Sequence, residues 1–229
     1  MRITALLASA LLIGIGGYAA ATPADQEALC TAAKSGTPAD IDALIKKGAK
    51  VDGYCKNVSD SALGTAMTVA SVDNMEALIN AGAKVGGSKS HLGYARNAAS
   101  AELLLKHGAK VNEVDKFGNT PLLSLTSTLA SNFPDFYQMT EQDAVDIAKL
   151  LIAHGAKVNF ADKYGGTALI EASFACLPNL VALLIDNGAD VNARSSTQTG
   201  LARLRNIKDM HPTECGQTEQ VLLAHGATE

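Results

Sequence analysis

The sequence lacks the short motifs by which many enzymes are recognised. It contains no nucleophile elbow, no phosphate-binding loop and no His-Glu-x-x-His motif. Its four cysteines never fall in a Cys-x-x-Cys spacing, so neither a thioredoxin-like redox centre nor a common zinc ligand pair is indicated. The carboxylates are scattered rather than paired for acid–base chemistry. We therefore interpret the chain as a non-enzyme and expect no catalytic residue, no metal and no cofactor.

An excess of basic residues is also missing. Nineteen Lys and Arg stand against 23 Asp and Glu, a net charge of −4 at pH 7. Binding to nucleic acid depends on neutralising phosphates, and this balance gives no electrostatic footprint for it. Beyond the N-terminus, no apolar run is long enough to cross a bilayer.

The N-terminus carries the one long apolar stretch, MRITALLASALLIGIGGYAAATP. One basic residue precedes the apolar run, which ends in small residues, and this is the pattern of a secretory signal peptide. Ala19 and Ala21 meet the small-residue requirement, so we expect a signal peptide over residues 1–21 and a mature domain over residues 22–229. A membrane anchor is the alternative, but the run is short, contains three glycines and has no basic flank. The sequence thus predicts a periplasmic protein, with secretion as the alternative.

One phrase recurs along the mature chain: glycine, alanine, a polar residue and valine. Copies begin at Gly48, Gly82, Gly108, Gly155 and Gly188, and a truncated copy begins at Gly226. Successive spacings of 34, 26, 47, 33 and 38 residues scatter about a common period. Such self-similarity indicates a repeat architecture, in which each unit buries its apolar face against its neighbours.

The clearest unit is residues 162–192, DKYGGTALIEASFACLPNLVALLIDNGADVN. Leucines at helical spacing precede Gly188, which can end a helix in the left-handed conformation. Residues 162–165 have the composition of a turn, and Thr167 can cap the helix that follows. Each unit is therefore predicted to form a hairpin turn, a helix, a short loop, a second helix and a glycine stop.

These repeats resemble the ankyrin-repeat family over nearly the whole mature chain. The resemblance implies an all-α fold, a solenoid of about six helix pairs joined by β-hairpin-like turns, with the first and last pairs as caps. We expect the unbound protein to be monomeric. Departures from the period predict a trimmed third pair with a short first helix around Leu92. They also predict an insertion at about residues 126–140, before a capping box of Thr140 and Asp143, and a smaller one at residues 206–217 between the last two helices.

The same solenoid limits how the cysteines can pair. Its two ends would lie on the order of 50 Å apart, whereas a disulfide needs Cα atoms within about 7 Å. Cys30 falls in the first pair and Cys55 in the adjacent turn, and Cys176 and Cys215 fall in inter-helix loops of neighbouring pairs. The resemblance therefore implies the bonds Cys30–Cys55 and Cys176–Cys215. The alternative is four free, mostly buried thiols.

Ankyrin repeats usually bind other proteins through their hairpin tips and the concave face formed by the first helices. Carried over to this sequence, the tip positions are Lys116, Phe117, Asn119, Lys163 and Tyr164, with Phe160 just before the second tip. Phe117 and Tyr164 occupy the same turn position, where a globular core does not need an aromatic residue but an interface favours one. The alternative is that each ring packs on the neighbouring turn.

The predicted insertion is the second candidate for partner binding. Phe133, Phe136 and Tyr137 fall within five residues, although aromatic residues make up only 4% of the chain. A surface loop this apolar either packs on its own solenoid or contacts a partner.

Two functions agree with these features. The first is a periplasmic interaction module, a scaffold or accessory protein that binds a partner of the cell envelope. The alternative is an immunity protein that binds and neutralises a toxin delivered to the periplasm. The acidic mature chain suits the basic surface of such a toxin.

Overall fold

A computed structural model of the chain describes residues 22–56, 60–86, 91–130, 139–196, 198–207 and 212–228. The predicted signal peptide, residues 1–21, lies outside this part of the chain. The aromatic residues Phe133, Phe136 and Tyr137 of the predicted insertion also lie outside it.

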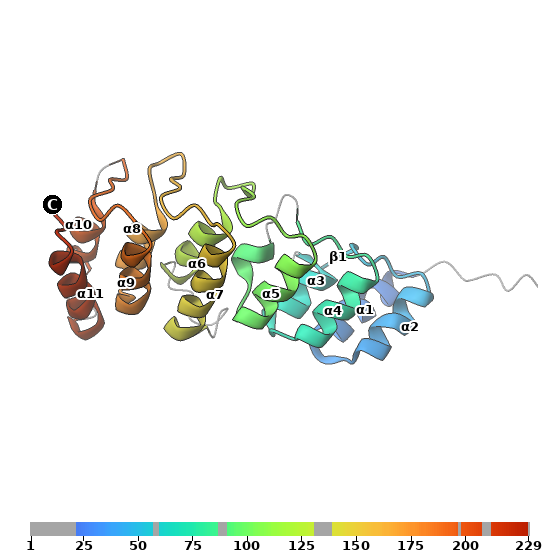
Figure 1. Cartoon of the computed structure of the whole chain (residues 1–229). Coiled ribbons are helices and arrows are strands. Elements are labelled where there is room, and N and C mark those ends of the chain that lie inside the picture. The colour runs from blue at the N-terminus through green and yellow to red at the C-terminus, as the bar shows by residue number, and fades with distance from the viewer. Residues whose placement is uncertain are drawn as a thin grey trace, which may run out of the picture.

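Helix pairs stack side by side along the chain and form an elongated solenoid (Figure 1). In chain order, the pairs are α1 Pro23–Ser35 with α2 Pro38–Lys46, α3 Ala62–Thr68 with α4 Val72–Asn80, the 3-10 helix η1 His91–Tyr94 with α5 Ala98–Lys106, α6 Pro121–Ala130 with α7 Glu141–Ala153, α8 Ala168–Phe174 with α9 Pro178–Asp186, and α10 Gly200–Arg205 with α11 Pro212–Ala224. Two short strands, β1 Tyr54–Cys55 and β2 Asp60–Ser61, form an antiparallel hairpin before α3. The predicted all-α solenoid is confirmed.

Each pair ends at one of the recurring glycines, as expected. Gly188 is representative: its φ is 85°, in the left-handed region that side chains other than glycine adopt at a cost. Its N–H donates to the carbonyl of Ile185 at 2.9 Å, and the N–H of Ala189 donates to the carbonyl of Leu184 at 2.9 Å. The glycine therefore satisfies the last carbonyls of α9 and turns the chain toward the next hairpin.

One continuous core joins all six pairs. First helices pack on first helices, such as α6 on α8 and α8 on α10, while second helices pack on second helices, such as α7 on α9 and α9 on α11. Each pair contributes at least one leucine with no exposed surface: Leu29, Leu63, Leu104, Leu151, Leu184 and Leu222. No pair could bury these side chains alone, because each lies against a neighbour.

Side-chain amides form a second set of links between successive pairs. Asn159 accepts from the Asp190 N–H at 2.8 Å and donates to the Gly188 carbonyl at 2.7 Å. Asn112 and Asn192 make the same two bonds one repeat earlier and one repeat later. A side-chain amide can donate and accept at once, whereas Asp52, at the equivalent position after the first pair, only accepts, from the Lys84 N–H at 3.0 Å. The equivalent position after the second pair is Gly86, which has no side chain to form the link.

The first pair begins with capping boxes rather than with a hairpin. The Thr22 side chain accepts from the Asp25 N–H at 3.2 Å, and the Asp25 carboxylate accepts from the Thr22 N–H at 2.9 Å. The Thr22 side-chain bond, helped by the backbone bond, lowers the pKa of Asp25. A lowered pKa stabilises the fold above the ordinary carboxyl pKa, and this contribution is lost as the pH falls through the lowered value. Thr37 and Asp40 form the same box on α2.

The irregular spacings of the third and fourth pairs are absorbed in different ways. In the third pair, the short spacing leaves room for one 3-10 turn only, and a Cβ at Gly93 would lie 2.6 Å from the Ser124 Cβ. In the fourth pair, residues 126–130 of the predicted insertion are helical, because α6 continues to Ala130, and the Thr140–Asp143 capping box then starts α7 as predicted.

The expectation for the last pair is wrong in one respect. Residues 212–217, predicted to lie in a loop, form the first turns of α11, so Cys215 lies on a helix. Pro212 suits the first helical position, and Glu214 in the first turn interacts favourably with the helix dipole.

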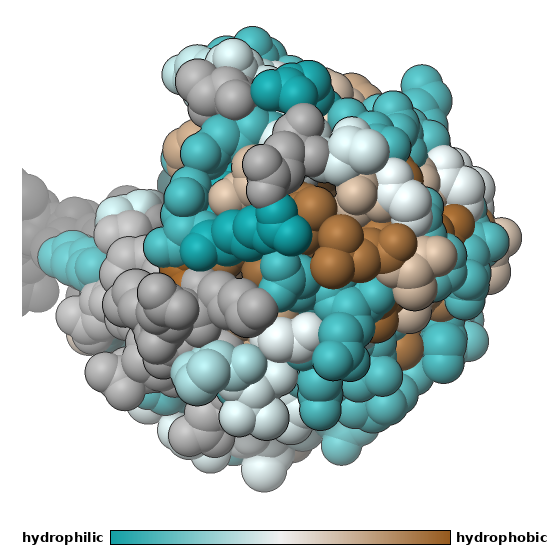
Figure 2. All heavy atoms as spheres, turned by 90° about the vertical axis from the view of Figure 1, so that its left-hand side faces the viewer, coloured by the Kyte–Doolittle hydropathy of each residue, from teal (hydrophilic) through white to brown (hydrophobic). Residues whose placement is uncertain are grey.

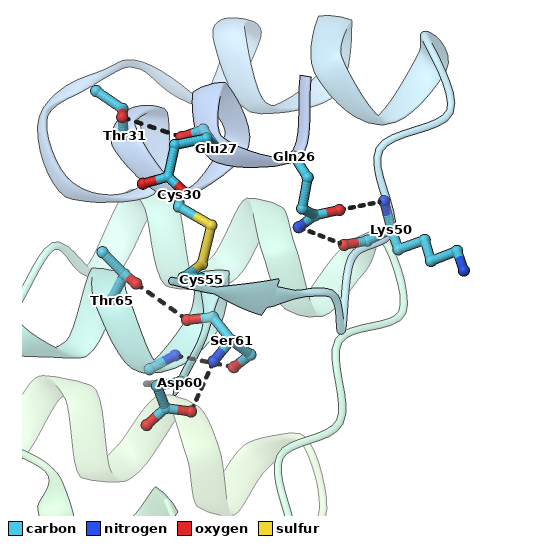
Figure 3. The surroundings of a disulfide bond; sticks show 10 residues. Gln26, Glu27, Cys30, Thr31, Lys50, Cys55, Asp60, Ser61 and Thr65 are labelled. Atoms are coloured by element: carbon cyan, nitrogen blue, oxygen red, sulfur yellow. Dashed lines mark hydrogen bonds between the residues drawn. A yellow bond between two sulfur atoms is a disulfide. The ribbon is translucent and has the colours of Figure 1, made fainter. Parts of the chain in front are cut away.

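Two disulfide bonds fasten the terminal pairs to their neighbours. Cys30 of α1 is bonded to Cys55 of β1, with Cα atoms 5.8 Å apart (Figure 3). Cys176, in the loop after α8, is bonded to Cys215 of α11, with Cα atoms 4.6 Å apart. These are the pairs that the solenoid led us to expect, and all four residues are buried.

The C-terminal end face is not uniformly hydrophilic (Figure 2). Apolar residues show between the polar ones, and Leu223 of α11 has 46% of its surface exposed. A terminal repeat usually covers the core with a polar outer face. The last pair does so only in part.

Candidate functional site

Hairpins project from one edge of the solenoid, and three of them stand side by side before α6, α8 and α10 (Figure 1). Short antiparallel bridges close the later two, between Ala161 and Thr167 and between Arg194 and Thr199. Because each of these three hairpins follows a glycine stop and leads into a first helix that packs on the next first helix in the stack, we expect their spacing to be the 8–10 Å of packed helices.

The turns before α6 and α8 share one geometry, which their sequences explain. In the second, the Asp162 carboxylate accepts from the N–H groups of Tyr164 at 2.7 Å and Gly166 at 2.8 Å. The Asp162 carbonyl accepts from the Gly165 N–H at 3.0 Å, and Gly165 has a φ of 80°. Aspartate is suited to such a turn because its side chain can bond to the backbone two residues on.

The Asp115 turn repeats this arrangement. Its carboxylate accepts from the N–H groups of Phe117 at 2.8 Å and Asn119 at 3.0 Å. The residue between acid and aromatic is lysine in both turns, and the turn therefore points a lysine and an aromatic ring outward from each tip.

The two aromatic side chains are among the most exposed large apolar groups of the described residues. Phe117 is 59% exposed and Tyr164 is 63% exposed. At each tip the ring contacts the lysine that precedes it in sequence: Lys116 Nζ lies 4.8 Å from the Phe117 centroid, and Lys163 Nζ lies 4.9 Å from the Tyr164 centroid. Neither ring is buried against the next turn.

The other two predicted tip residues are placed differently. Asn119 is half-buried, and its carbonyl accepts from the Asp115 N–H at 3.0 Å, so its backbone closes the turn. Phe160 is half-buried at the base of its hairpin, where its N–H donates to the Lys157 carbonyl at 3.1 Å. Of the six residues predicted for the tips, Lys116, Phe117, Lys163 and Tyr164 are exposed and form two lysine–aromatic pairs. The other two, Asn119 and Phe160, are half-buried.

Sequence reasoning missed two exposed apolar residues on hairpins, one before α3 and one before α6. Tyr54, on β1, is 61% exposed, and Val114, just before the Asp115 turn, is 47% exposed. Their hairpin positions do not match the aspartate-lysine-aromatic-glycine pattern, so the repeat gave no signal for them. With Phe117 and Tyr164, they make four of the six exposed large apolar residues in the described ranges. We call these four residues the tip row.

Neighbouring hairpins also hold one another. The Ser196 N–H donates to the Tyr164 carbonyl at 2.7 Å, and a Cβ at Gly165 would lie 2.8 Å from the Arg194 carbonyl oxygen. Glycine is needed at position 165 both for its positive φ and for this close approach. The tips therefore form a preorganised surface, and little conformational entropy would be lost on binding.

A shallow depression of about 510 Å³ lies between α2 and α4. Asp42, Asp73 and Glu76 line it together with apolar and amide side chains. Within the described ranges, no three His, Cys, Asp or Glu side chains gather as a metal site. No helix in the same ranges combines the length and apolar character needed to cross a membrane.

Comparison with known proteins now adds to this geometry. The family model described as ankyrin repeats in three copies matches residues 136–195. A crystal structure of an ankyrin repeat domain from Acinetobacter baumannii is 25% identical, with a TM-score of 0.62, over 87% of this chain and 98% of that chain. This chain is an ankyrin-repeat protein. The ankyrin repeat domain of Bcl-3, described as a unique member of the IkappaB protein family, is also 25% identical, with a TM-score of 0.58, over 76% of this chain and 75% of that chain.

No curated protein sequence is significantly similar to this ankyrin-repeat protein. The ankyrin fold is typically a scaffold for protein–protein interaction rather than for catalysis, which makes the chain an interaction module. The two disulfides and the helix lengths are compatible with an exported protein.

Proposed function

We propose that this protein is a non-enzymatic interaction module of the periplasm, and that its tip row binds another protein of the cell envelope. One observation carries the proposal: Phe117 and Tyr164 occupy the same position on adjacent hairpins and expose 59% and 63% of their surfaces. Exposing two such rings is costly for a free protein, whereas aromatic side chains are common anchors of interfaces.

Export is proposed from residues 1–21 and the two disulfides, which suit an oxidising compartment. The capping box of Thr22 starts the folded part, so cleavage after Ala21 leaves the solenoid whole. We expect the protein purified from a periplasmic extract to begin at Thr22, which N-terminal sequencing measures. A chain that still begins with Met1 and stays in the cytoplasm would contradict the proposal.

The tip row is tested by affinity capture from a bacterial envelope extract. The variant Phe117→Ala/Tyr164→Ala should retain the fold, because both rings are exposed, and should capture its partner at least tenfold less. The amount of each captured protein is measured by quantitative mass spectrometry against wild type.

Val69→Ala/Leu223→Ala is the matched control, because it removes two other exposed apolar side chains away from the hairpins, 42% and 46% exposed. This control should capture as wild type does. Equal capture by the tip variant, or no protein retained by wild type above bare resin, would reject the proposal.

A further inference from the structure

Exposed basic side chains recur on the hairpins of a protein that is acidic overall. An exposed basic side chain stands on each of four hairpins: Lys56 after β1, Lys116 before α6, Lys163 before α8 and Arg194 before α10. The chain as a whole has a net charge of −4. In the two matching turns, an exposed basic side chain thus stands beside each exposed aromatic ring.

The aspartates in the two matching turns are less exposed than the lysines beside them. Asp115 is only 6% exposed, and each turn aspartate directs its Oδ1 atom toward two backbone N–H groups. Each aspartate–lysine pair is therefore neutral as a whole, but the carboxylate faces the backbone of the turn, whereas the lysine ammonium group lies over the ring and is exposed to solvent. A partner approaching either tip meets a cation beside an apolar ring.

We infer that the tip row binds an acidic polypeptide segment, whose carboxylates pair with Lys116 and Lys163 while its apolar side chains cover Phe117 and Tyr164. Adjacent tips are about 10 Å apart, the spacing of packed helices. A polyproline II segment rises about 3.1 Å per residue with about three residues per turn, so carboxylates three residues apart lie on one side and would match successive tips. The inference rests on the proposed function and names the chemistry of its partner.

Two other ligands fit the observations less well. Single-stranded nucleic acid also pairs cations with stacking surfaces, but its charges follow one another far more closely than the tips do, and the acidic remainder of the protein repels it. A basic toxin suits the net charge but would bring its cations against Lys116 and Lys163. The exposed lysines at the tips predict the charge of the partner better than the net charge of the protein does, because salt screens charges beyond about 10 Å.

The experiment is a selection from a random twelve-residue peptide display library on the disulfide-bonded protein. Peptides retained by wild type should be enriched in Asp and Glu, with pairs three residues apart. For the best of these synthetic peptides, Lys116→Glu/Lys163→Glu should weaken binding at least tenfold, and Lys116→Gln/Lys163→Gln should weaken it less. Raising the salt concentration should weaken wild-type binding and leave the glutamate variant little changed.

Lys106→Glu/Lys149→Glu is the control, because it changes the net charge equally on the second helices α5 and α7, and it should bind as wild type does. Retained peptides without acidic enrichment, or equal binding by the glutamate variant, would overturn the inference. Binding of an oligothymidylate probe to wild type, lost in the glutamate variant, would also overturn the inference, because it would indicate a nucleic-acid ligand. If Phe117→Ala/Tyr164→Ala loses envelope capture while the retained peptides lack acidic residues, the proposed binding at the tip row is supported and the inference of an acidic partner is rejected.

Discussion

Replacing Cys176 and Cys215 by alanine should lower the free energy of unfolding by about 4 kcal/mol. The bond closes a loop of 39 residues, and the chain-entropy model assigns about this stabilisation to a loop of that length. The last pair has a neighbour on one side only, so it depends on this bond more than an internal pair would. Urea denaturation of the oxidised proteins, followed by circular dichroism, measures the difference.

The variant Cys176→Gly/Cys215→Ala provides a matched control. Cys176 has a φ of 55°, in the left-handed region where glycine is unstrained, so this variant should lose about 1 kcal/mol less than the alanine pair. Cys30→Ala/Cys55→Ala opens a loop of 25 residues and should cost about 3.5 kcal/mol. Four thiols alkylated in the non-reduced wild-type protein would contradict both predictions.

The regular parts of the fold could be predicted because each rests on local chemistry repeated along the chain. Gly188 marks a left-handed helix end, Thr167 caps the following helix, and leucines at helical spacing mark the buried face. Such signals depend on neighbours in sequence, so they survive changes in spacing. These signals predicted all six helix pairs, including those where the spacing between repeat glycines is 26 or 47 residues.

Boundaries next to the irregular spacings could not be predicted in the same way. Whether residues 126–130 extend α6 or begin a loop depends on packing against α8, which local composition does not encode. The 38-residue spacing made residues 206–217 look like an inter-helix insertion, but burial of Cys215 and Leu222 holds α11 in place despite Gly216. In both cases tertiary contacts override propensity.

The candidate site was predicted in part for the same reason. Phe117 and Tyr164 were found because they repeat within a recognisable turn, and the aspartate bonds that shape this turn are local. Tyr54 and Val114 lie on hairpins without sharing the motif. Their membership of the tip row follows only from their exposure in the folded protein.

The Glu141 side chain of α7 forms hydrogen bonds to the N-terminus of α9. The variant Glu141→Ala should therefore lower the free energy of unfolding by about 2–3 kcal/mol. Leu177, at the N-cap of α9, provides no side-chain cap. The Glu141 carboxylate takes its place: it accepts from the Asn179 N–H at 2.8 Å, the Leu180 N–H at 3.2 Å and the Asn179 side-chain amide at 2.9 Å. Bonds to a charged acceptor at a helix N-terminus are among the stronger ones.

Removing this carboxylate leaves two backbone N–H groups of α9 without a protein acceptor, at a joint between pairs. Glu141→Gln keeps an acceptor oxygen but loses the charge, so it should cost about half as much. Glu102→Ala on α5, an exposed glutamate, should change stability by less than about 0.5 kcal/mol. Hydrogen exchange at Asn179 and Leu180 gives the local readout: faster exchange in Glu141→Ala supports the cap, whereas unchanged exchange and stability would show that α9 is held by its buried leucines alone.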